Sequence, residues 1–291
     1  MLPREALTPS RRQPDRTGTA PPPLCLLRGG GDLATGVAWR LTRAGWAVVV
    51  LELPEPLTIR RTVALSTAVA EGEVNVQGMR GVLTASPEEA AAATRRGDAA
   101  VMVAADRSAL GPLRPDVVVD ARMAKRNIDT SRDDAGLVVA LGPGFIAGKD
   151  CHAVVETMRG HRLGRVIWTG SAQPDTGSPA ELGGRSADRV LRAPAAGKVD
   201  WCVAIGEMVI DGQPLGEVGG VTLRAPFDGV LRGAIRGGMK VRAGLKVGDV
   251  DPRGDPSACW EISDKALAVG GGVMEAVMAR PGGAIDPPSW C

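Results

Sequence analysis

The feature that most constrains the fold is a strand, a glycine loop, a helix and a second strand in direct succession. Leu24 to Leu27 is a short apolar run that leads into Arg28-Gly-Gly-Gly31. From Asp32 to Ala44 apolar residues recur at helical spacing, and Ala47 to Glu52 begins with five apolar residues, as in a buried strand. The pattern predicts a βαβ unit, in which a helix connects two parallel strands.

Weaker patterns of the same kind continue to about residue 190. The predicted strands are Ala99–Ala104, Val117–Val119, Leu137–Leu141 and Arg165–Thr169, and the predicted helices are Pro87–Arg96 and Asp150–Arg159. This alternation of strands and helices predicts a mostly parallel sheet with helices on its faces.

After about residue 190 the sequence changes to short β-like segments between glycines, and it repeats itself. Leu191-Arg-Ala-Pro194 returns as Leu223-Arg-Ala-Pro226, an offset of 32 residues. The same offset aligns Gly197 with Gly229, Gly206 with Gly238, Val209 with Val241, Gly212 with Gly244, and Gly216-Glu-Val218 with Gly248-Asp-Val250. Two repeats are too few for a solenoid, so the sequence predicts a small β domain of two quasi-symmetric halves.

The repeat, with its Ala-Pro starts and later glycine turns, resembles the barrel-sandwich fold of biotinyl and lipoyl carrier domains. In that fold the hairpin that joins the halves carries the modified lysine. The corresponding segment here, Glu217 to Leu223, contains no lysine. Covalent biotin or lipoate is therefore not expected, and the resemblance implies a docking or structural module.

The predicted fold class is α/β, with a Rossmann-like, mostly parallel sheet domain, a small barrel-sandwich module and a C-terminal helix. The predicted boundaries are 1–23 for a disordered extension rich in Pro and Arg, 24–189 for the sheet domain and 190–253 for the module. Residues 254–291 form the last helix, predicted over Asp264–Arg280, and a tail.

Charge and composition exclude several classes of protein. The 291 residues include 35 Lys and Arg against 33 Asp and Glu, a formal net charge of +2. Binding to nucleic acid or to a membrane surface requires a basic excess, which this chain lacks. No stretch approaches the roughly 18 consecutive apolar residues of a membrane-spanning helix. The five dispersed cysteines form no Cys-x-x-Cys pair, which favours reduced thiols and a cytoplasmic protein.

The glycine loop carries the clearest functional pattern. Gly29-x-Gly31-x-x-Ala34 matches the G-x-G-x-x-A form of the dinucleotide-binding fingerprint. Glycines let the backbone approach a pyrophosphate, and free N–H groups at the start of the next helix stabilise its charge. The predicted cofactor-binding residues of this loop and the next strand are Gly29, Gly30, Gly31, Asp32, Thr35 and Glu52. Glu52 would accept hydrogen bonds from ribose hydroxyls.

Two alternatives stay open at the glycine loop. The loop is either a dinucleotide site or a glycine-rich turn that binds nothing. Asp32 either caps the helix by accepting backbone hydrogen bonds, or repels a phosphate at the same position.

Further binding residues are predicted where two later strands end. Arg122 and Lys125 follow the strand that ends at Asp120, and positive side chains at that edge of a parallel sheet can hold anionic groups. Gly142 and Gly144 form a second glycine loop. Solvated surface charge is the alternative for the two cations.

His152 and Glu156 are weak candidates for a metal or acid–base pair, because they stand four apart on one face of a predicted helix. The pattern contains no third ligand, so an ordinary hydrogen bond is favoured and no metal site is predicted. Cys151, at the start of that helix, is either a reactive thiol or a buried structural one.

Several longer segments of the sequence are distinctive: Arg28-Gly-Gly-Gly-Asp-Leu-Ala-Thr-Gly36, Pro56-Leu-Thr-Ile-Arg-Arg-Thr-Val63, Asp120-Ala-Arg-Met-Ala-Lys-Arg-Asn127, Gly142-Pro-Gly-Phe-Ile-Ala-Gly-Lys-Asp-Cys-His152, Glu156-Thr-Met-Arg-Gly-His161, Ile262-Ser-Asp-Lys265 and Gly270-Gly-Gly-Val-Met-Glu275. Together they resemble a bacterial family, the accessory proteins of the selenium-dependent molybdenum hydroxylase system, related to xanthine dehydrogenase accessory factors. The resemblance covers about residues 24–280. It implies a pathway more firmly than a reaction.

Three functions follow as hypotheses. The first is an accessory or maturation factor that binds a dinucleotide, with the molybdenum-pterin dinucleotide cofactor as one candidate, and that docks a client hydroxylase. The second is an NAD(P)-dependent oxidoreductase, for which the sequence identifies no substrate-polarising group. The third is a non-catalytic partner-binding protein. Whether the chain is an enzyme, and whether it forms a homo-oligomer, stay open.

Overall fold

The computed structural model describes residues 21–104, 107–175, 177, 184–185 and 187–279. Most of the predicted extension, residues 1–20, lies outside this range, as do Arg280 and the predicted tail.

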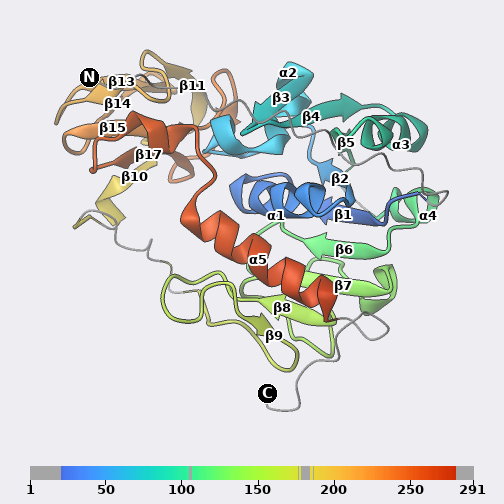
Figure 1. The fold of residues 1–291 in the computed structure, drawn as a ribbon. Coiled ribbons are helices and arrows are strands. Elements are labelled where there is room, and N and C mark those ends of the chain that lie inside the picture. The colour runs from blue at the N-terminus through green and yellow to red at the C-terminus, as the bar shows by residue number, and fades with distance from the viewer. Residues whose placement is uncertain (1–20, 105–106, 176, 178–183, 186, 280–291) are drawn as a thin grey trace, which may run out of the picture.

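The largest unit of the structure is a mixed sheet of nine strands, in the spatial order β3-β4-β5-β2-β1-β6-β7-β8-β9 (Figure 1). Neighbouring strands from β4 to β8 pair in parallel, and the antiparallel hairpins β3-β4 and β8-β9 form its two edges. The strands are β1 (Leu24–Arg28), β2 (Ala47–Glu52), β3 (Glu73–Val76), β4 (Met79–Thr84), β5 (Ala99–Val103), β6 (Val117–Asp120), β7 (Leu137–Leu141), β8 (Ala153–Val155) and β9 (Val166–Ile167). The central strands are continuous apolar runs because both of their faces are buried.

Helices cover both faces of the large sheet. The helices are α1 (Asp32–Arg43), α2 (Ala68–Glu71), α3 (Pro87–Arg95), α4 (Leu110–Leu113) and α5 (Asp264–Met278). One hydrophobic core lies under α1 and α5, and a second lies on the opposite face under α3 and α4. Five short 3₁₀ segments complete the described helical structure: η1 (Arg61–Val63), η2 (Leu65–Thr67), η3 (Arg132–Asp134), η4 (Ala187–Arg189) and η5 (Pro256–Cys259).

Helix α5 packs along α1 and against β7, β8 and β9 (Figure 1). The two helices approach closely because glycines face each other. A Cβ on Gly270 would lie 2.6 Å from the carbonyl oxygen of Gly36, and a Cβ on Gly36 would meet the carbonyl oxygen of Ala266. The last helix therefore belongs to the layer that covers the large sheet, although about 100 residues of sequence separate it from β9.

Two four-stranded antiparallel sheets make up the β module, in the orders β10-β17-β15-β12 and β14-β13-β11-β16. Their strands are β10 (Val190–Arg192), β11 (Gly197–Trp201), β12 (Met208–Val209), β13 (Pro214–Val218), β14 (Val221–Arg224), β15 (Gly229–Ala234), β16 (Lys240–Val241) and β17 (Lys246–Asp251). The 32-residue offset found in the sequence relates β10–β13 to β14–β17 and exchanges the two sheets. The module encloses its own hydrophobic core.

The segment just before η1 joins the β module to the large sheet. The Ala234 N–H donates to the carbonyl oxygen of Ile59 at 2.9 Å, and Arg61 Nε donates to the Ala234 carbonyl oxygen at 2.8 Å. A Cβ on Gly233 would lie 2.8 Å from Ile59 Cγ2, so this approach requires glycine. Backbone and side-chain hydrogen bonds thus fix the module beside the glycine loop.

The predicted fold class is wrong as stated. Instead of a Rossmann-like domain followed by a barrel-sandwich module, the chain forms a nine-stranded mixed sheet with antiparallel edges and two separate antiparallel sheets. The predicted last helix is present as α5. No α-helix connects β6 to β7 or β7 to β8, all of whose connecting residues are described. In their place α5, from the far end of the sequence, covers β7, β8 and β9.

Two local predictions also need correction. The segment Asp150–Arg159 is not a helix: it contains β8, whose three residues are all fully buried. The sequence analysis did not identify the hairpin β3-β4. Within the part of the chain that is described, no helix has the length and apolar character needed to cross a membrane.

Candidate functional site

The candidate site lies at the edge of the large sheet where β1, β2 and β6 end. Arg28, the last residue of β1, pairs with Leu51 of β2 and with Asp120 of β6. The loops that follow these strands are therefore neighbours. They carry the glycine loop, Glu52 and Arg122, as expected for a switch point between two parallel strands.

Two of the three loop glycines are tightly enclosed. Gly29 has φ +96°, and a Cβ there would lie 3.1 Å from the carbonyl oxygen of Ala121. A Cβ on Gly30 would lie 2.9 Å from Val50 Cγ1 and 3.0 Å from the backbone nitrogen of Ser66. These positions require glycine because the chain passes close to neighbouring segments.

Gly31 differs, because one side of it is open. Its φ is −66°, and a Cβ at this position would meet no atom within 4 Å. It is the N-cap residue of α1, and no side chain caps that helix. The first N–H groups of α1 therefore remain available to an anion.

Glu52 holds the glycine loop in place. Its Oε1 accepts a 2.6 Å hydrogen bond from the Gly30 N–H, and its Oε2 accepts a 2.8 Å bond from the Leu53 N–H. Burial raises the pKa of this carboxyl, and the two backbone hydrogen bonds offset part of the rise. In this structure the side chain thus contacts loop backbone, and contact with a ribose stays a prediction.

Thr35 and Asp32 occupy the first turn of α1 in different ways. The buried Thr35 hydroxyl donates to the Gly31 carbonyl at 2.9 Å and accepts from the Leu65 N–H at 3.0 Å, so it fastens the helix to η2. Asp32 does not cap the helix. Its carboxylate instead lies 3.6 Å from Arg60 Nη1.

Arg122 belongs to a network of charges between β6 and the following loop. It binds Asp120 at 2.6 Å and Asp129 at 2.8 Å, and Arg28 reaches the same Asp129 at 2.7 Å. Burial alone would raise the pKa of Asp129, but hydrogen bonds from the two arginines lower it. Because carboxylates already hold Arg122, its predicted role with an anionic ligand would require exchange of partners.

The other predicted binding residues have structural partners. Lys125 Nζ forms an exposed 2.6 Å ion pair with Asp175. Gly142 and Gly144 have φ of +73° and +103°, and a Cβ on either would collide with Thr157 or Arg126. The second glycine loop is thus shaped by close packing of neighbouring chain segments.

His152 and Glu156 do not form a pair. His152 Nδ1 accepts a 3.0 Å hydrogen bond from the Val138 N–H. Glu156 is buried, and its carboxylate accepts backbone hydrogen bonds from Thr157, Met158 and Gln173 at 2.7–2.8 Å. No group of three or more metal-ligating side chains occurs among the residues that the structure describes.

Cys151 is buried, and burial raises the pKa of its thiol to about 12. Of the two alternatives for this residue, the buried structural thiol agrees with the geometry.

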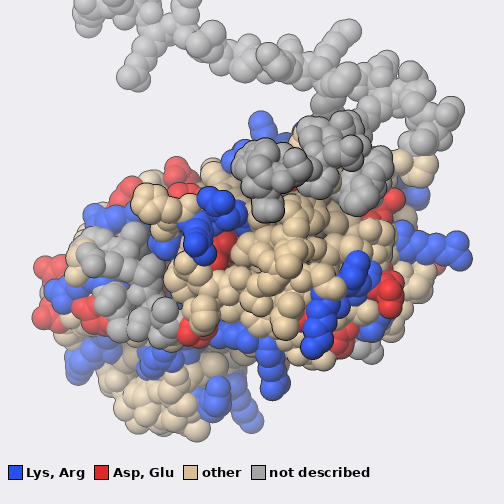
Figure 2. All heavy atoms as spheres, turned by 90° about the horizontal axis from the view of Figure 1, so that it is seen from below, with Lys and Arg blue, Asp and Glu red and all other residues tan. Residues whose placement is uncertain are grey.

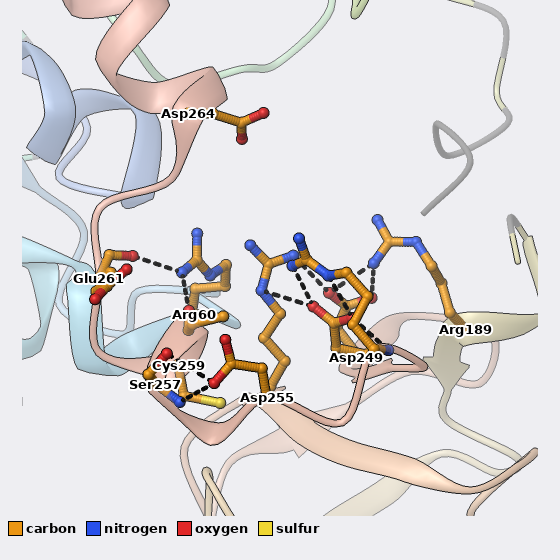
Figure 3. Close-up of polar contacts among 12 residues, drawn as sticks. Arg60, Arg189, Asp249, Asp255, Ser257, Cys259, Glu261 and Asp264 are labelled. Carbon is orange, nitrogen blue, oxygen red and sulfur yellow. Dashed lines mark hydrogen bonds and ion pairs between the residues drawn. The ribbon is translucent and has the colours of Figure 1, made fainter. Parts of the chain in front are cut away.

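Sequence analysis did not predict that Arg232, Lys246 and Lys265 would lie with Arg60 beside the glycine loop. Arg60 precedes η1, Arg232 lies in β15, Lys246 in β17 and Lys265 in α5. Figure 3 shows Arg60 beside Glu261, Asp249 of the β module and Arg189 of η4 farther to the right, and Asp264 above them at the start of α5. One signal was present in the sequence: Arg232 is a charged residue within the otherwise uncharged strand β15. All six residues of that strand are buried. A charged residue at such a position needs a partner or a ligand.

Comparison with known proteins gives one extensive sequence match. The uncharacterized protein YqeB of Escherichia coli K12 is 48% identical over 255 residues, which are 88% of this chain and 47% of YqeB. The chain thus spans about half the length of this relative. No family model matches.

The solved structures that resemble this fold do so weakly. An aspartoacylase family protein from Mesorhizobium loti is 12% identical, with a TM-score of 0.27 over 79% of this chain and 85% of that one. The product-bound ectoine utilization protein EutE of Ruegeria pomeroyi is 14% identical, with a TM-score of 0.24 over the same shares. Similarity at this level supports no assignment of fold or function.

Proposed function

We propose that this chain is an accessory or maturation factor for selenium-dependent molybdenum hydroxylases that binds a dinucleotide at the β1–α1 glycine loop. The molybdenum-pterin dinucleotide cofactor is the first candidate ligand. The observation that carries the proposal is the open side of Gly31, at a helix N-terminus that no side chain caps. The pathway rests on the sequence resemblance described above.

The geometry supports phosphate recognition by backbone groups. Glu52, Ser66 and Ala121 enclose Gly29 and Gly30, and only the Gly31 side is left for a ligand. A pyrophosphate there would receive N–H groups from the first turn of α1 and a favourable helix dipole. Glu52 would keep the loop in the binding conformation.

Docking of a client hydroxylase is the second part of the proposal. Large apolar side chains are exposed in the segments that follow the carboxyl ends of parallel strands, which is the edge of the sheet that carries the loop. They are Leu53, Leu57, Ile128 and Ile146. Exposed apolar groups beside a ligand site are typical of a protein contact surface.

The remaining parts of the proposal concern partners and compartment. The face in Figure 2 shows Lys and Arg side chains interspersed with Asp and Glu around a broad uncharged area. The mixed charge on this face agrees with a protein partner better than with nucleic acid or a membrane surface. The proposed compartment is the cytoplasm.

The test compares ligands released from three proteins produced in a host that makes molybdenum cofactor. Gly31→Asp places a carboxylate on the open side of the loop, where there is room for it. Gly111→Asp is the matched control, because Gly111 is exposed in α4 and a Cβ there also meets nothing. After denaturation, mass spectrometry identifies any small molecule bound to each protein.

We expect a dinucleotide from the wild type and from Gly111→Asp, and none from folded Gly31→Asp. Equal amounts from all three proteins would contradict the proposed site. Release of NAD(H), with consumption of reduced nicotinamide when carbonyl substrates are added, would place the oxidoreductase function first.

A further inference from the structure

Four basic side chains come from separate parts of the chain to the junction between the large sheet, the β module and α5, and one of them, Arg60, reaches the first turn of α1. They are Arg60, Arg232, Lys246 and Lys265, here named the junction cluster. Two of them come from the β module, one from the segment that joins it to the large sheet, and one from α5. Asp32, in the first turn of α1, lies 3.6 Å from Arg60 and close enough to raise the pKa of both lysines.

Arg60 is buried but only partly satisfied. Its side chain is 8% exposed, and Nη2 donates to the carbonyl oxygens of Ala258 and Glu261 at 3.0 Å. Its Nε is buried without any hydrogen-bond partner. The two carbonyl contacts fix the guanidinium in place and leave part of it unsatisfied.

Arg232 is even less satisfied. The residue is 7% exposed, and its guanidinium donates no hydrogen bond to any described residue. Its nearest carboxylates, Asp251 and Asp249, lie at 3.6 and 4.0 Å. Burial lowers the pKa of this arginine, and the charge of Arg60 lowers it further. A buried guanidinium without hydrogen bonds is costly unless it has a ligand to bind.

The two lysines are half-buried, and they too lack a close partner. Neither Lys246 nor Lys265 forms an ion pair within 4.0 Å or a side-chain hydrogen bond with the described part of the chain. Burial lowers the pKa of both ammonium groups, and neighbouring arginines add to that effect.

The carboxylates around the junction cluster have closer partners elsewhere. Arg189 binds Asp249 at 2.8 Å, Arg253 binds Asp251 at 2.7 Å, and Arg159 binds Asp264 at 2.7 Å. Figure 3 shows Arg189 reaching Asp249 from the side away from Arg60. Of Asp32, Asp249, Asp251 and Asp264, Asp32 is the one that has no closer ion-pair partner outside the cluster in the described part of the chain. Positive charge is in excess at this position.

From this arrangement we infer that the junction cluster binds a diphosphate group, held between the N-terminus of α1 and the four basic side chains. The inference rests on the proposed nucleotide site, and it assigns the β module a direct part in that site. A diphosphate offers several acceptor oxygens and multiple negative charge, which match the unsatisfied donors of Arg232 and Arg60 and both ammonium groups. Asp32 occupies the position near Arg60 until the anion displaces it.

Calorimetric titration of the full chain with inorganic pyrophosphate tests the inference. Arg232→Gln and Lys246→Gln remove one charge each, and each is expected to weaken binding by about tenfold or more. Asp32→Asn removes the competing carboxylate and is expected to tighten binding, a change that misfolding would not produce. Arg95→Gln and Lys240→Gln are the matched controls, because both side chains are exposed and form no side-chain hydrogen bond or ion pair with the described residues; we expect wild-type affinity.

Two outcomes overturn the inference: wild-type affinity in both Arg232→Gln and Lys246→Gln, or weaker binding in Asp32→Asn. Failure of the proposed function gives a different result. In that case no dinucleotide is released from the wild type, but substitutions in the junction cluster still change the affinity for pyrophosphate. If instead the wild type releases a dinucleotide and the cluster variants bind pyrophosphate with wild-type affinity, the inference alone fails.

Discussion

At the scale of single residues, buried charges of the β module are satisfied very unequally. Asp251 is fully buried and receives hydrogen bonds from the Arg253 side chain at 3.0 and 2.7 Å. Arg232, on the neighbouring strand, lies 3.6 Å from the same carboxylate and donates no hydrogen bond to it. The contrast shows that burial alone does not give each charged group of the module a close partner.

Asp251 provides a stability prediction with a defined pH dependence. Burial alone would raise the pKa of its carboxyl, but the hydrogen bonds and charge of Arg253, with the charge of Arg232, lower it. The stabilisation is therefore present above the unfolded-state pKa of about 3.9 and is lost as the pH falls through the lower folded-state value. Asp251→Asn should lower the free energy of unfolding by about 1–3 kcal/mol at neutral pH.

Urea unfolding at neutral and at strongly acidic pH measures this effect. The wild type and Asp251→Asn should become more similar in stability as the pH falls. Asp200→Asn, at an exposed ion pair with Lys198, serves as the control and should change stability by less than about 1 kcal/mol. A difference for Asp251→Asn that does not decrease with acid would contradict the assigned role of Arg253.

Thiol reactivity provides a second prediction at this scale. Cys25, Cys151 and Cys259 are buried, and burial raises the pKa of each thiol, whereas Cys202 is exposed. Alkylation of the native protein with iodoacetamide near neutral pH should modify Cys202 well before the three buried thiols. Peptide mapping identifies each modified cysteine. Rapid modification of Cys151 would contradict its assignment as a buried structural thiol.

At the scale of elements, contact between α1 and α5 depends on which glycine faces the partner helix. Gly270 and Gly271 are adjacent in α5, but only Gly270 lies against the backbone of Gly36. A Cβ on Gly271 meets no atom within 4 Å. Of these two adjacent glycines, Gly270 is therefore required for the contact between the helices and Gly271 is not.

These two glycines give a paired prediction. Gly270→Ala should destabilise the protein by about 1–3 kcal/mol, because the added methyl group pushes the helices apart. Gly271→Ala should be neutral or stabilise by up to about 1 kcal/mol, since alanine is the better helix former. Denaturant unfolding of both variants checks this. Equal effects would contradict the α1–α5 contact.

Sequence reasoning succeeded where the pattern was local and failed where distant segments decide the structure. The strand, glycine loop, helix and strand over 24–52, and the 32-residue repeat, follow from spacing within one segment. The helix predicted over 150–159 was wrong, since an apolar run this short suits either element and pairing with β7 decides for β8. Within the site, the glycine loop was predictable, but the junction cluster was not, because its members are brought together only by folding.

At the scale of the whole molecule, the proposed site would join the glycine loop to the β module and α5. The loop would supply backbone N–H groups from one part of the chain, and the junction cluster would supply positive charge from residues 60 to 265. Such a division would let a near-neutral protein recognise an anion.

Anion binding at this position should depend on pH. Burial lowers the pKa of Lys246 and Lys265, and a bound diphosphate favours their charged forms. Affinity for pyrophosphate should therefore fall as the pH rises through the lowered pKa values, with proton uptake on binding. Titrations in buffers of different ionisation enthalpy measure that uptake. Lys246→Gln should flatten the pH profile, and an unchanged profile would argue against the lysine as a contact.

The most direct measurement of the central claim is client activation in cells. A selenium-dependent molybdenum hydroxylase is produced in a strain that lacks this protein, which is then supplied as wild type, Gly31→Asp or Gly111→Asp at equal amounts. We predict that the wild type and Gly111→Asp restore hydroxylase activity and that Gly31→Asp does not. Equal activation by all three proteins, or no activation by the wild type, would contradict a maturation role that depends on the glycine loop.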